Sequence, residues 1–150
     1  MRHRTILLVE DNPDDEELTR RALRSGMILN PLEVVRDGAA ALDYLLAPGT
    51  DVGRDPEDLP VVVLLDLKLP KVDGLEVLRR LRAAGRTRHL PVVVLTSSTE
   101  EQDLVASYRL LANSYVRKPV NVVEFSEAVR TLGIYWALVN RLPVTPPCGS

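Results

Sequence analysis

The sequence predicts an α/β fold of the doubly wound class, in which helices cover both faces of one parallel sheet. Apolar segments of strand length alternate along the chain with segments of helical periodicity. Three of the strand segments also lack polar residues at alternate positions, which is typical of strands buried on both faces of a parallel sheet. The five expected strands are residues 6–9, 32–35, 61–65, 92–95 and 114–116.

The helix boundaries follow from capping residues between these strands. Asn12 and Pro13 supply a capping side chain and a first-turn proline for the first helix, and the acids at 14–17 suit a helix N-terminus. This helix is expected to end near Ser25 and Gly26. The later helices are expected to begin at Asp37-Gly38 (39–46), Asp73-Gly74 (75–84), Ser98-Thr99 and Asn121, and residues 48–60 are expected to form a loop.

Composition excludes several classes of protein. The chain has 150 residues, 45% of them hydrophobic, and a net charge of -2, so one ordinary domain is expected and disorder is excluded. Cys148 is the only cysteine, so no internal disulfide forms. The longest aliphatic run, residues 61–65, is far below the ~20 residues of a membrane helix. We therefore expect a cytoplasmic protein without a membrane segment.

Basic residues gather in one part of the sequence. The arginines there are interpreted as the solvated face of the third helix, because the slightly acidic net charge disfavours nucleic-acid binding through a bulk positive field. These residues are Arg79, Arg80, Arg82, Arg86 and Arg88.

Chemically active residues follow the predicted strands. Since the carboxyl ends of parallel strands meet at one edge of a sheet, these side chains are expected to share one crevice. Three clustered carboxylates require a cation, and hard oxygen ligands favour Mg²⁺. Asp66 then becomes a candidate nucleophile that forms an acyl phosphate, with a hydroxyl and an ammonium to bind the phosphoryl oxygens. The residues are Glu10, Asp11, Asp66, Thr96 and Lys118.

Four motifs follow one another along the chain: Val9-Glu10-Asp11-Asn12-Pro13, Leu65-Asp66-Leu67-Lys68-Leu69-Pro70 with Asp73-Gly74, Leu95-Thr96-Ser97 and Lys118-Pro119. In this order they resemble the receiver domain of two-component response regulators, over residues 5–133. The resemblance implies a flavodoxin-like sheet with strand order 2-1-3-4-5. It also implies a single receiver domain at 1–142 with an extended fifth helix, a Pro-rich tail at 143–150 and no output domain.

The resemblance further implies that Asp66 accepts a phosphoryl group from the phosphohistidine of a sensor histidine kinase. By the same resemblance Asp11 binds Mg²⁺ directly, Glu10 supports it through water, and the Lys68 backbone carbonyl is a further ligand. Such a protein is a signalling phosphoacceptor that assists its own Mg²⁺-dependent phosphorylation and dephosphorylation, and not an enzyme.

Two residues are implied to act after phosphorylation. Thr96, which would bind phosphoryl oxygens together with Lys118, and Tyr115, at the family's aromatic switch position, would move together. The Lys118-Pro119 bond is implied to be cis. The long last helix, the acidic loop and the missing effector most resemble the stand-alone regulators paired with bacterial phytochrome kinases.

Two alternatives use the same residues differently. An aspartyl-phosphate phosphatase would use the same nucleophile, but such enzymes usually carry a second acid two residues later, where this chain has Lys68. A docking protein whose site no longer switches is the other alternative.

We predict that Lys68 slows loss of the phosphoryl group by pairing with one of its oxygens.

Residues 132–139 are apolar on nearly every side, which is typical of a helix buried all round. Either the tail at 143–150 or a second subunit covers this surface. We expect a homodimer, the commonest closed assembly, through the fourth helix, the fifth strand and the fifth helix. The expected interface residues are Leu104, Tyr108, Leu111, Ile134, Trp136 and Leu138.

Overall fold

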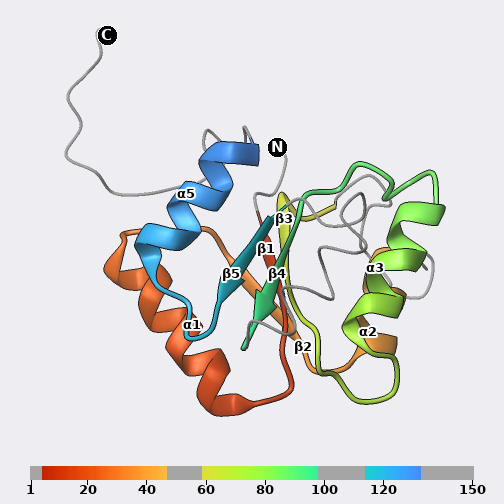
Figure 1. Ribbon diagram of the computed structural model, residues 1–150, viewed down its shortest axis with the longest axis horizontal. Coiled ribbons are helices and arrows are strands. Elements are labelled where there is room, and N and C mark those ends of the chain that lie inside the picture. The colour runs from red at the N-terminus through yellow and green to blue at the C-terminus, as the bar shows by residue number, and fades with distance from the viewer. Residues whose placement is uncertain (1–4, 47–58, 98–113, 133–150) are drawn as a thin grey trace, which may run out of the picture.

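The computed structural model describes residues 5–46, 59–97 and 114–132, and its centre is a five-stranded sheet (Figure 1). The strand order is β2-β1-β3-β4-β5 and every neighbouring pair is parallel, which confirms the doubly wound prediction. The strands are β1 Ile6–Val9, β2 Leu32–Val35, β3 Val62–Asp66, β4 Val92–Thr96 and β5 Ser114–Arg117.

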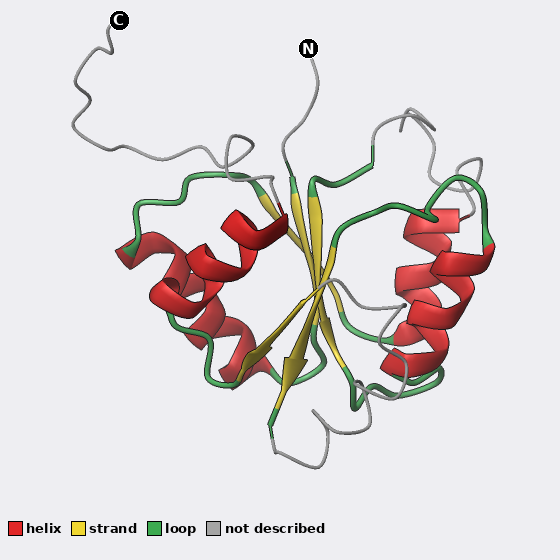
Figure 2. Cartoon of the chain, turned by 45° about the horizontal axis from the view of Figure 1, so that its top comes forward, coloured by secondary structure: helices red, strands yellow, loops and turns green. Residues whose placement is uncertain are grey.

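Helices cover both faces of this sheet. Figures 1 and 2 show α1 and α5 on one face and α2 and α3 on the other. The expected fourth helix lies outside the described residues, as does nearly all of the expected loop at 48–60. Within the described ranges, no helix is both long and apolar enough to cross a bilayer. The described helices are α1 Pro13–Ser25, α2 Gly38–Leu46, α3 Gly74–Ala83 and α5 Val122–Leu132.

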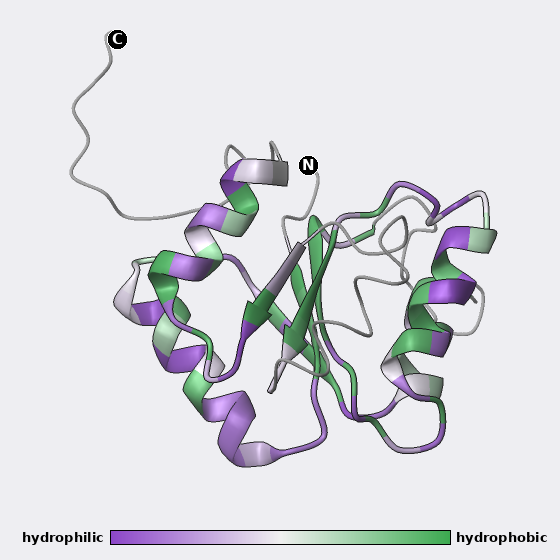
Figure 3. Cartoon of the chain, in the orientation of Figure 1, coloured by the Kyte–Doolittle hydropathy of each residue, from purple (hydrophilic) through white to green (hydrophobic). Residues whose placement is uncertain are grey.

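The sheet separates two apolar clusters because neighbouring side chains of a strand point to opposite faces. Leu7 and Val9 of β1 pack toward α2 and α3, whereas Ile6 and Leu8 pack toward α1 and α5. In Figure 3 the central strands are hydrophobic, while the helices mix hydrophobic and hydrophilic residues. Each fully buried Leu, Ile or Val contributes roughly 1.5–3 kcal/mol. This burial on both faces explains the lack of polar alternation in the sequence.

Side-chain caps fix where the helices begin. Asn12 Oδ1 accepts hydrogen bonds from the backbone N–H groups of Asp14 at 2.8 Å and Asp15 at 3.1 Å. Asp73 Oδ1 accepts from Glu76 N at 3.0 Å at the start of α3. A cap of this kind contributes typically ~1 kcal/mol. The caps predicted at Asn12 and Asp73 are therefore confirmed, and both helices start at the edge of the sheet where β1 and β3 end.

The arginine-rich face is partly structural, so its interpretation as a solvated surface is wrong for two residues. Arg82 Nη1 donates to the carbonyl oxygens of Leu90 at 2.7 Å and Arg88 at 3.1 Å. Arg86 Nε donates to Leu45 O at 3.1 Å, which ties the segment after α3 to the end of α2. Arginine forms several directed hydrogen bonds at once, and here these bonds hold backbone carbonyl groups before β4 and at the end of α2.

The acids of the first turn of α1 are also not equivalent. Glu16, which we interpreted only as an acid suited to the helix N-terminus, has a side chain that is 12% exposed and forms ion pairs with Arg20 and Arg36. Hydrogen bonding to Arg36, aided by Arg20, lowers the pKa of Glu16 below its usual value although burial acts in the opposite direction. Glu16 therefore connects α1 to the segment that follows β2.

Candidate functional site

Three carboxylates converge at the carboxyl ends of β1 and β3. One oxygen from each of Glu10, Asp11 and Asp66 lies within 4.8 Å of the other two. The parallel register pairs Val9 with Leu65, so the next residues, Glu10 and Asp66, lie side by side. Glu10 is fully buried and Asp66 is 5% exposed, whereas Asp11 faces solvent. This geometry is the acidic cluster that the strand ends predicted.

Lys118 provides the positive charge of the cluster. Its Nζ lies 3.2 Å from Glu10 Oε1, 3.3 Å from Asp66 Oδ2 and 2.9 Å from Asp15 Oδ2. The Lys118 backbone N–H donates to Thr96 O at 2.7 Å, and the Lys118-Pro119 bond is cis, as the sequence resemblance implied. Burial acts to lower the pKa of Lys118, but the hydrogen bond to Asp15 and the charges of Asp66 and Glu10 outweigh it and raise the pKa above its usual value.

The buried carboxylates destabilise one another. Burial, followed by the negative charge of Asp66, raises the pKa of Glu10 to about 7, although Lys118 acts to lower it. The Lys118 ammonium alone therefore does not offset the effects of burial and of the Asp66 charge on the pKa of Glu10. Hard oxygen donors from three carboxylates suit a divalent cation of the Mg²⁺ type. The donor set fits a metal ion here, and the ion would relieve the repulsion between the acids.

Thr96 supplies a buried hydroxyl to this edge of the sheet. It is the last residue of β4 and fully buried, and among the described residues its Oγ1 makes no hydrogen bond. Leaving a buried hydroxyl unpaired costs about 1–3 kcal/mol. Such a group in a native structure calls for an explanation, and a bound ligand is one. Since β4 is the neighbour of β3, this hydroxyl is available to a group attached to Asp66.

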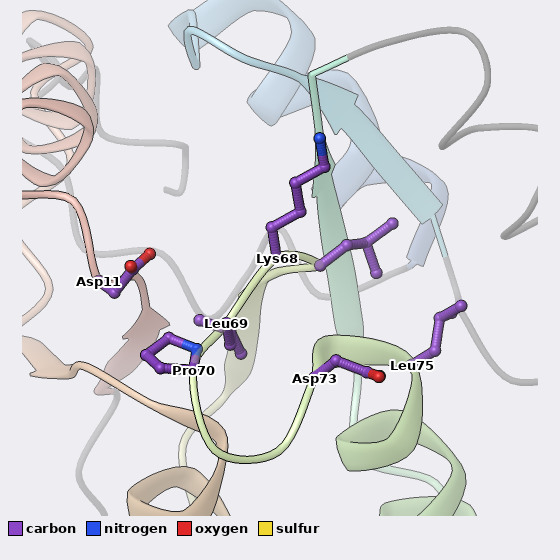
Figure 4. A pocket seen from close by; sticks show the side chains of 7 residues that line it. Asp11, Lys68, Leu69, Pro70, Asp73 and Leu75 are labelled. Atoms are coloured by element: carbon purple, nitrogen blue, oxygen red, sulfur yellow. The ribbon is translucent and has the colours of Figure 1, made fainter.

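A cavity of about 440 Å³ opens beside the cluster (Figure 4). Asp11 lines one side of it and the segment after Asp66 lines the other. Lys68 is exposed at its rim, and its backbone N–H lies 3.4 Å from Asp66 Oδ1. Of the three clustered acids, Asp11 is the one that lines this cavity. Its lining residues are Asp11, Leu67, Lys68, Leu69, Pro70, Asp73 and Leu75.

Gly74 allows α3 to start directly against the end of β3. Its N–H donates to Leu67 O at 2.9 Å, and a Cβ at this position would lie only 2.4 Å from Asp66 O. Real Cβ atoms essentially never approach another atom so closely. The Asp73-Gly74 motif therefore holds the backbone of Asp66 against the N-terminus of α3.

The remaining predicted residues fall in different places. Tyr115 is 42% exposed on β5, opposite Val94 in the strand register. Sequence reasoning missed the contact between Asp15 and Lys118, since it interprets the acids at 14–17 as suited to a helix N-terminus, on a helix expected to be the docking surface for the kinase. The expected interface residues Leu104, Tyr108, Leu111, Ile134, Trp136 and Leu138 all lie outside the described residues.

The fold and the site together define a doubly wound α/β protein with an acidic cluster, a lysine and a threonine at the carboxyl edge of its sheet. The chain belongs to the family described as "Response regulator receiver domain", whose model matches residues 6–130. This match confirms the resemblance drawn from the four sequence motifs.

The chain is similar to several characterised regulators. The structure of the bacteriophytochrome response regulator AtBRR superposes with a TM-score of 0.84 at 55% identity, covering 94% of this chain and 100% of that one. The response regulator Rcp1 of Synechocystis sp. is 38% identical over 93% of each chain, and the structure of its Mn²⁺-bound form has a TM-score of 0.68. The probable methanogenesis regulatory protein FilR2 of Methanothrix harundinacea is 46% identical over 92% of this chain and 86% of its own length.

Proposed function

We propose that this receiver domain is a signalling protein that accepts a phosphoryl group on Asp66 from the phosphohistidine of a sensor histidine kinase. The observation that carries the proposal is the arrangement of three groups at the carboxyl edge of the sheet. Asp66 lies in the acidic cluster, the Lys118 ammonium is 3.3 Å from its Oδ2, and the buried hydroxyl of Thr96, at the end of the neighbouring strand β4, has no hydrogen-bond partner among the described residues.

The proposed reaction is a direct transfer. A carboxylate oxygen of Asp66 attacks phosphorus and forms an acyl phosphate, while the phosphorus–nitrogen bond to the donor imidazole breaks and its electron pair stays on nitrogen. Lys118 and the Thr96 hydroxyl hydrogen-bond the equatorial oxygens as charge builds on them. Asp11, Asp66 and the Lys68 carbonyl would hold Mg²⁺, with Glu10 acting through water, and the ion would offset negative charge on the transferred group.

Phosphorylation then acts as a switch. Moving a two-state surface from rare to dominant requires about 5.5 kcal/mol of differential stabilisation. Hydrogen bonds to charged groups contribute about 1.5–3 kcal/mol each, so two or three new bonds to the phosphoryl oxygens are sufficient. We propose that Thr96 forms one of them and that Tyr115, exposed on the neighbouring strand β5, changes its position with Thr96.

The sensor kinase is proposed to be a bacterial phytochrome. Similarity to AtBRR over 94% of this chain supports this choice, and similarity to FilR2 makes a non-photosensory kinase the competing assignment. Transfer from a light-regulated phytochrome kinase to Asp66, faster than from an unrelated histidine kinase, would support the phytochrome pairing. Equal rates from both donors would refute it.

The organisation of the protein is part of the same proposal. We propose that residues 1–142 belong to one receiver domain that acts in the cytoplasm and that residues 143–150 are a tail. We propose a homodimer through the fourth helix, β5 and α5. Sedimentation that finds only monomer at micromolar concentration, with and without phosphorylation, would exclude the dimer.

The phosphoacceptor assignment is tested by labelling. Incubation with acetyl phosphate and Mg²⁺ should add one phosphoryl group to the wild-type chain, measured by intact mass, and none to Asp66→Asn. The matched control is Asp73→Asn, which removes an acid of the same cavity wall that lies outside the cluster. Stoichiometric labelling of Asp66→Asn would refute the assignment.

Multiple turnovers of a generic phosphomonoester would support the phosphatase alternative. The presence of Lys68 at the position of the usual second acid disfavours this alternative.

A further inference from the structure

Among the described residues, Lys118 forms three ion pairs, and the one with Asp15 is the shortest. The Oδ2 atom of Asp15 lies 2.9 Å from Lys118 Nζ, compared with 3.2 Å for Glu10 and 3.3 Å for Asp66. The Lys118 side chain is only 14% exposed and that of Asp15 only 30% exposed, so water weakens this pair less than an ordinary surface pair. The acidic cluster itself consists of Glu10, Asp11 and Asp66, and Asp15 stands outside it.

The local structure holds Asp15 in this position. Its backbone N–H donates to Asn12 Oδ1 at 3.1 Å, so the cap fixes the first turn of α1. Asn12 directly follows Asp11, and its own N–H lies 3.3 Å from Glu10 Oε2. The first turn of α1 is thus attached to the acidic cluster at its start, and the Asp15 carboxylate reaches Lys118 from a rigid element.

An ammonium has three N–H donors, and three carboxylates surround that of Lys118. Two of these partners have other roles under the proposed function. Glu10 and Asp66 belong to the donor set that fits a divalent ion, and Asp66 is the phosphoacceptor. During the reaction, carboxylate oxygens of both residues therefore interact with other groups instead of Lys118. Asp15 is the partner whose oxygens stay available throughout.

We infer that Asp15 is a positioning residue, which holds the Lys118 ammonium over Asp66 while the other two carboxylates change partners. The inference rests on the proposed function and deepens it. Asp15 touches neither the phosphoryl group nor the metal ion. Its effect passes through Lys118, whose placement decides how well the charge on the transferred group is stabilised.

Phosphorylation kinetics test the inference. At saturating Mg²⁺, Asp15→Ala should lower the rate constant of labelling by acetyl phosphate about tenfold, the effect of losing one charged hydrogen bond that orients a reacting group. Asp15→Glu, which keeps the carboxylate, should recover part of this rate. The matched control is Asp14→Ala, which removes the same charge from the same exposed turn. Among the described residues Lys118 is paired with Asp15 and not with Asp14.

A double-mutant cycle separates positioning from a general charge effect. In the Lys118→Ala background, Asp15→Ala should change the rate by less than about twofold, because the residue through which it acts is gone. The dissociation constant for Mg²⁺, measured by titration, should also change by less than about threefold in Asp15→Ala. A tenfold rate loss in both backgrounds would overturn the inference, and so would a loss explained entirely by weaker Mg²⁺ binding.

A readout without phosphorylation keeps the inference separate from the proposed function. In the metal-free chain, hydrogen-bonded protons of the Lys118 ammonium should give an observable ¹H–¹⁵N signal that is lost in Asp15→Ala and kept in Asp14→Ala. A signal unchanged in Asp15→Ala would overturn the positioning role. If the wild-type chain takes no label on Asp66, the proposed function fails, and the ammonium signal alone then decides whether Asp15 orients Lys118.

Discussion

The buried carboxylate of Glu10 and the ammonium of Lys118 lie 3.2 Å apart although 108 residues separate them in the chain. Strands β3 and β4 stand between the strands that these residues follow, so the lysine side chain extends over the carboxyl edge of the sheet. It meets Glu10 and Asp66 there and partly offsets their charge. The stability of the folded protein and the proposed phosphorylation of Asp66 therefore both depend on the Lys118 side chain.

Replacing Lys118 should destabilise the metal-free protein. Removing one partner of a buried ion pair costs about 3–5 kcal/mol. We expect about 2 kcal/mol for Lys118→Ala, because Glu10 can take up a proton instead. Added Mg²⁺ should recover part of this loss, since the ion offsets the same charges. Urea unfolding with and without Mg²⁺ measures both effects, and Lys71→Ala is the control, because its pair with Asp37 is 3.6 Å long and Lys71 is 68% exposed. An unchanged unfolding free energy in Lys118→Ala would contradict the charge assignment.

Replacing Thr96 should separate stability from switching. Its hydroxyl has no partner among the described groups, so Thr96→Val should keep or raise the free energy of unfolding. The matched control is Thr87→Val, since the buried Thr87 Oγ1 donates to Leu81 O at 2.6 Å and its loss should cost about 1 kcal/mol. Thr96→Val should nevertheless shorten the lifetime of phosphorylated Asp66, whereas Thr96→Ser should keep it. Equal destabilisation by both valine variants would show that Thr96 has an internal partner.

The ion pair between Glu16 and Arg36 should make stability dependent on pH. Because the pKa of Glu16 is lowered in the folded protein, its contribution is complete above the unfolded pKa of about 4.5 and is lost as the pH falls through the folded value. Glu16→Gln should therefore lower stability by about 1 kcal/mol at pH 7, between the values for exposed and buried pairs. This difference should shrink toward pH 3. Glu17→Gln, at an exposed position on the same helix, should have little effect at either pH.

Gly74→Ala should destabilise the fold and disturb the site. The added methyl would lie 2.4 Å from Asp66 O, and such overpacking costs about 1–3 kcal/mol. Phosphorylation should slow as well, since relief of the contact displaces the backbone of the phosphoacceptor. Gly85→Ala is the control, because no atom lies within 4 Å of its added Cβ. Thermal unfolding and labelling by acetyl phosphate measure the two effects, and a Gly74→Ala variant as stable as Gly85→Ala would contradict the packing argument.

Lys68→Asn should shorten the lifetime of the phosphorylated chain. Lys68 lies at the rim of the cavity two residues after Asp66, where its ammonium can pair with a phosphoryl oxygen and hinder the attacking water. Lys71→Asn is the control, because Lys71 is an exposed lysine of the same loop that pairs with Asp37. Decay of the phosphorylated mass after removal of the donor gives both lifetimes. An equal or longer lifetime for Lys68→Asn would disprove this role.

Much of the site was predictable because it depends on the ends of strands. The apolar segments of the sequence predicted the bounds of β1, β3 and β4 to within one residue. Glu10, Asp66 and Thr96 lie at the ends of these strands or directly after them. In a parallel sheet these ends meet at one edge whatever the details of packing. The cluster of acids with Lys118 therefore followed from the order of motifs along the chain.

Contacts between elements were not predictable in the same way. The burial of Glu16, the pairing of Asp15 with Lys118 and the capture of backbone carbonyls by Arg82 depend on how helices and loops sit against their neighbours. Locally, Asp15 and Glu16 look like any acids in a first helical turn. Periodicity records which face of an element is apolar, and it carries no information about which polar side chain meets which partner across the molecule.

Hydrophobic pattern and strand-end chemistry were thus enough to establish the doubly wound sheet and to assemble Glu10, Asp11, Asp66, Thr96 and Lys118, because both depend on local periodicity and on the direction of parallel strands. The folded arrangement alone settled the electrostatic partners of these residues. Ion pairs and orphaned hydroxyls are set by distances of a few ångströms between segments far apart in the chain. Those distances are fixed only once α1, β3 and the segment after β5 have packed together.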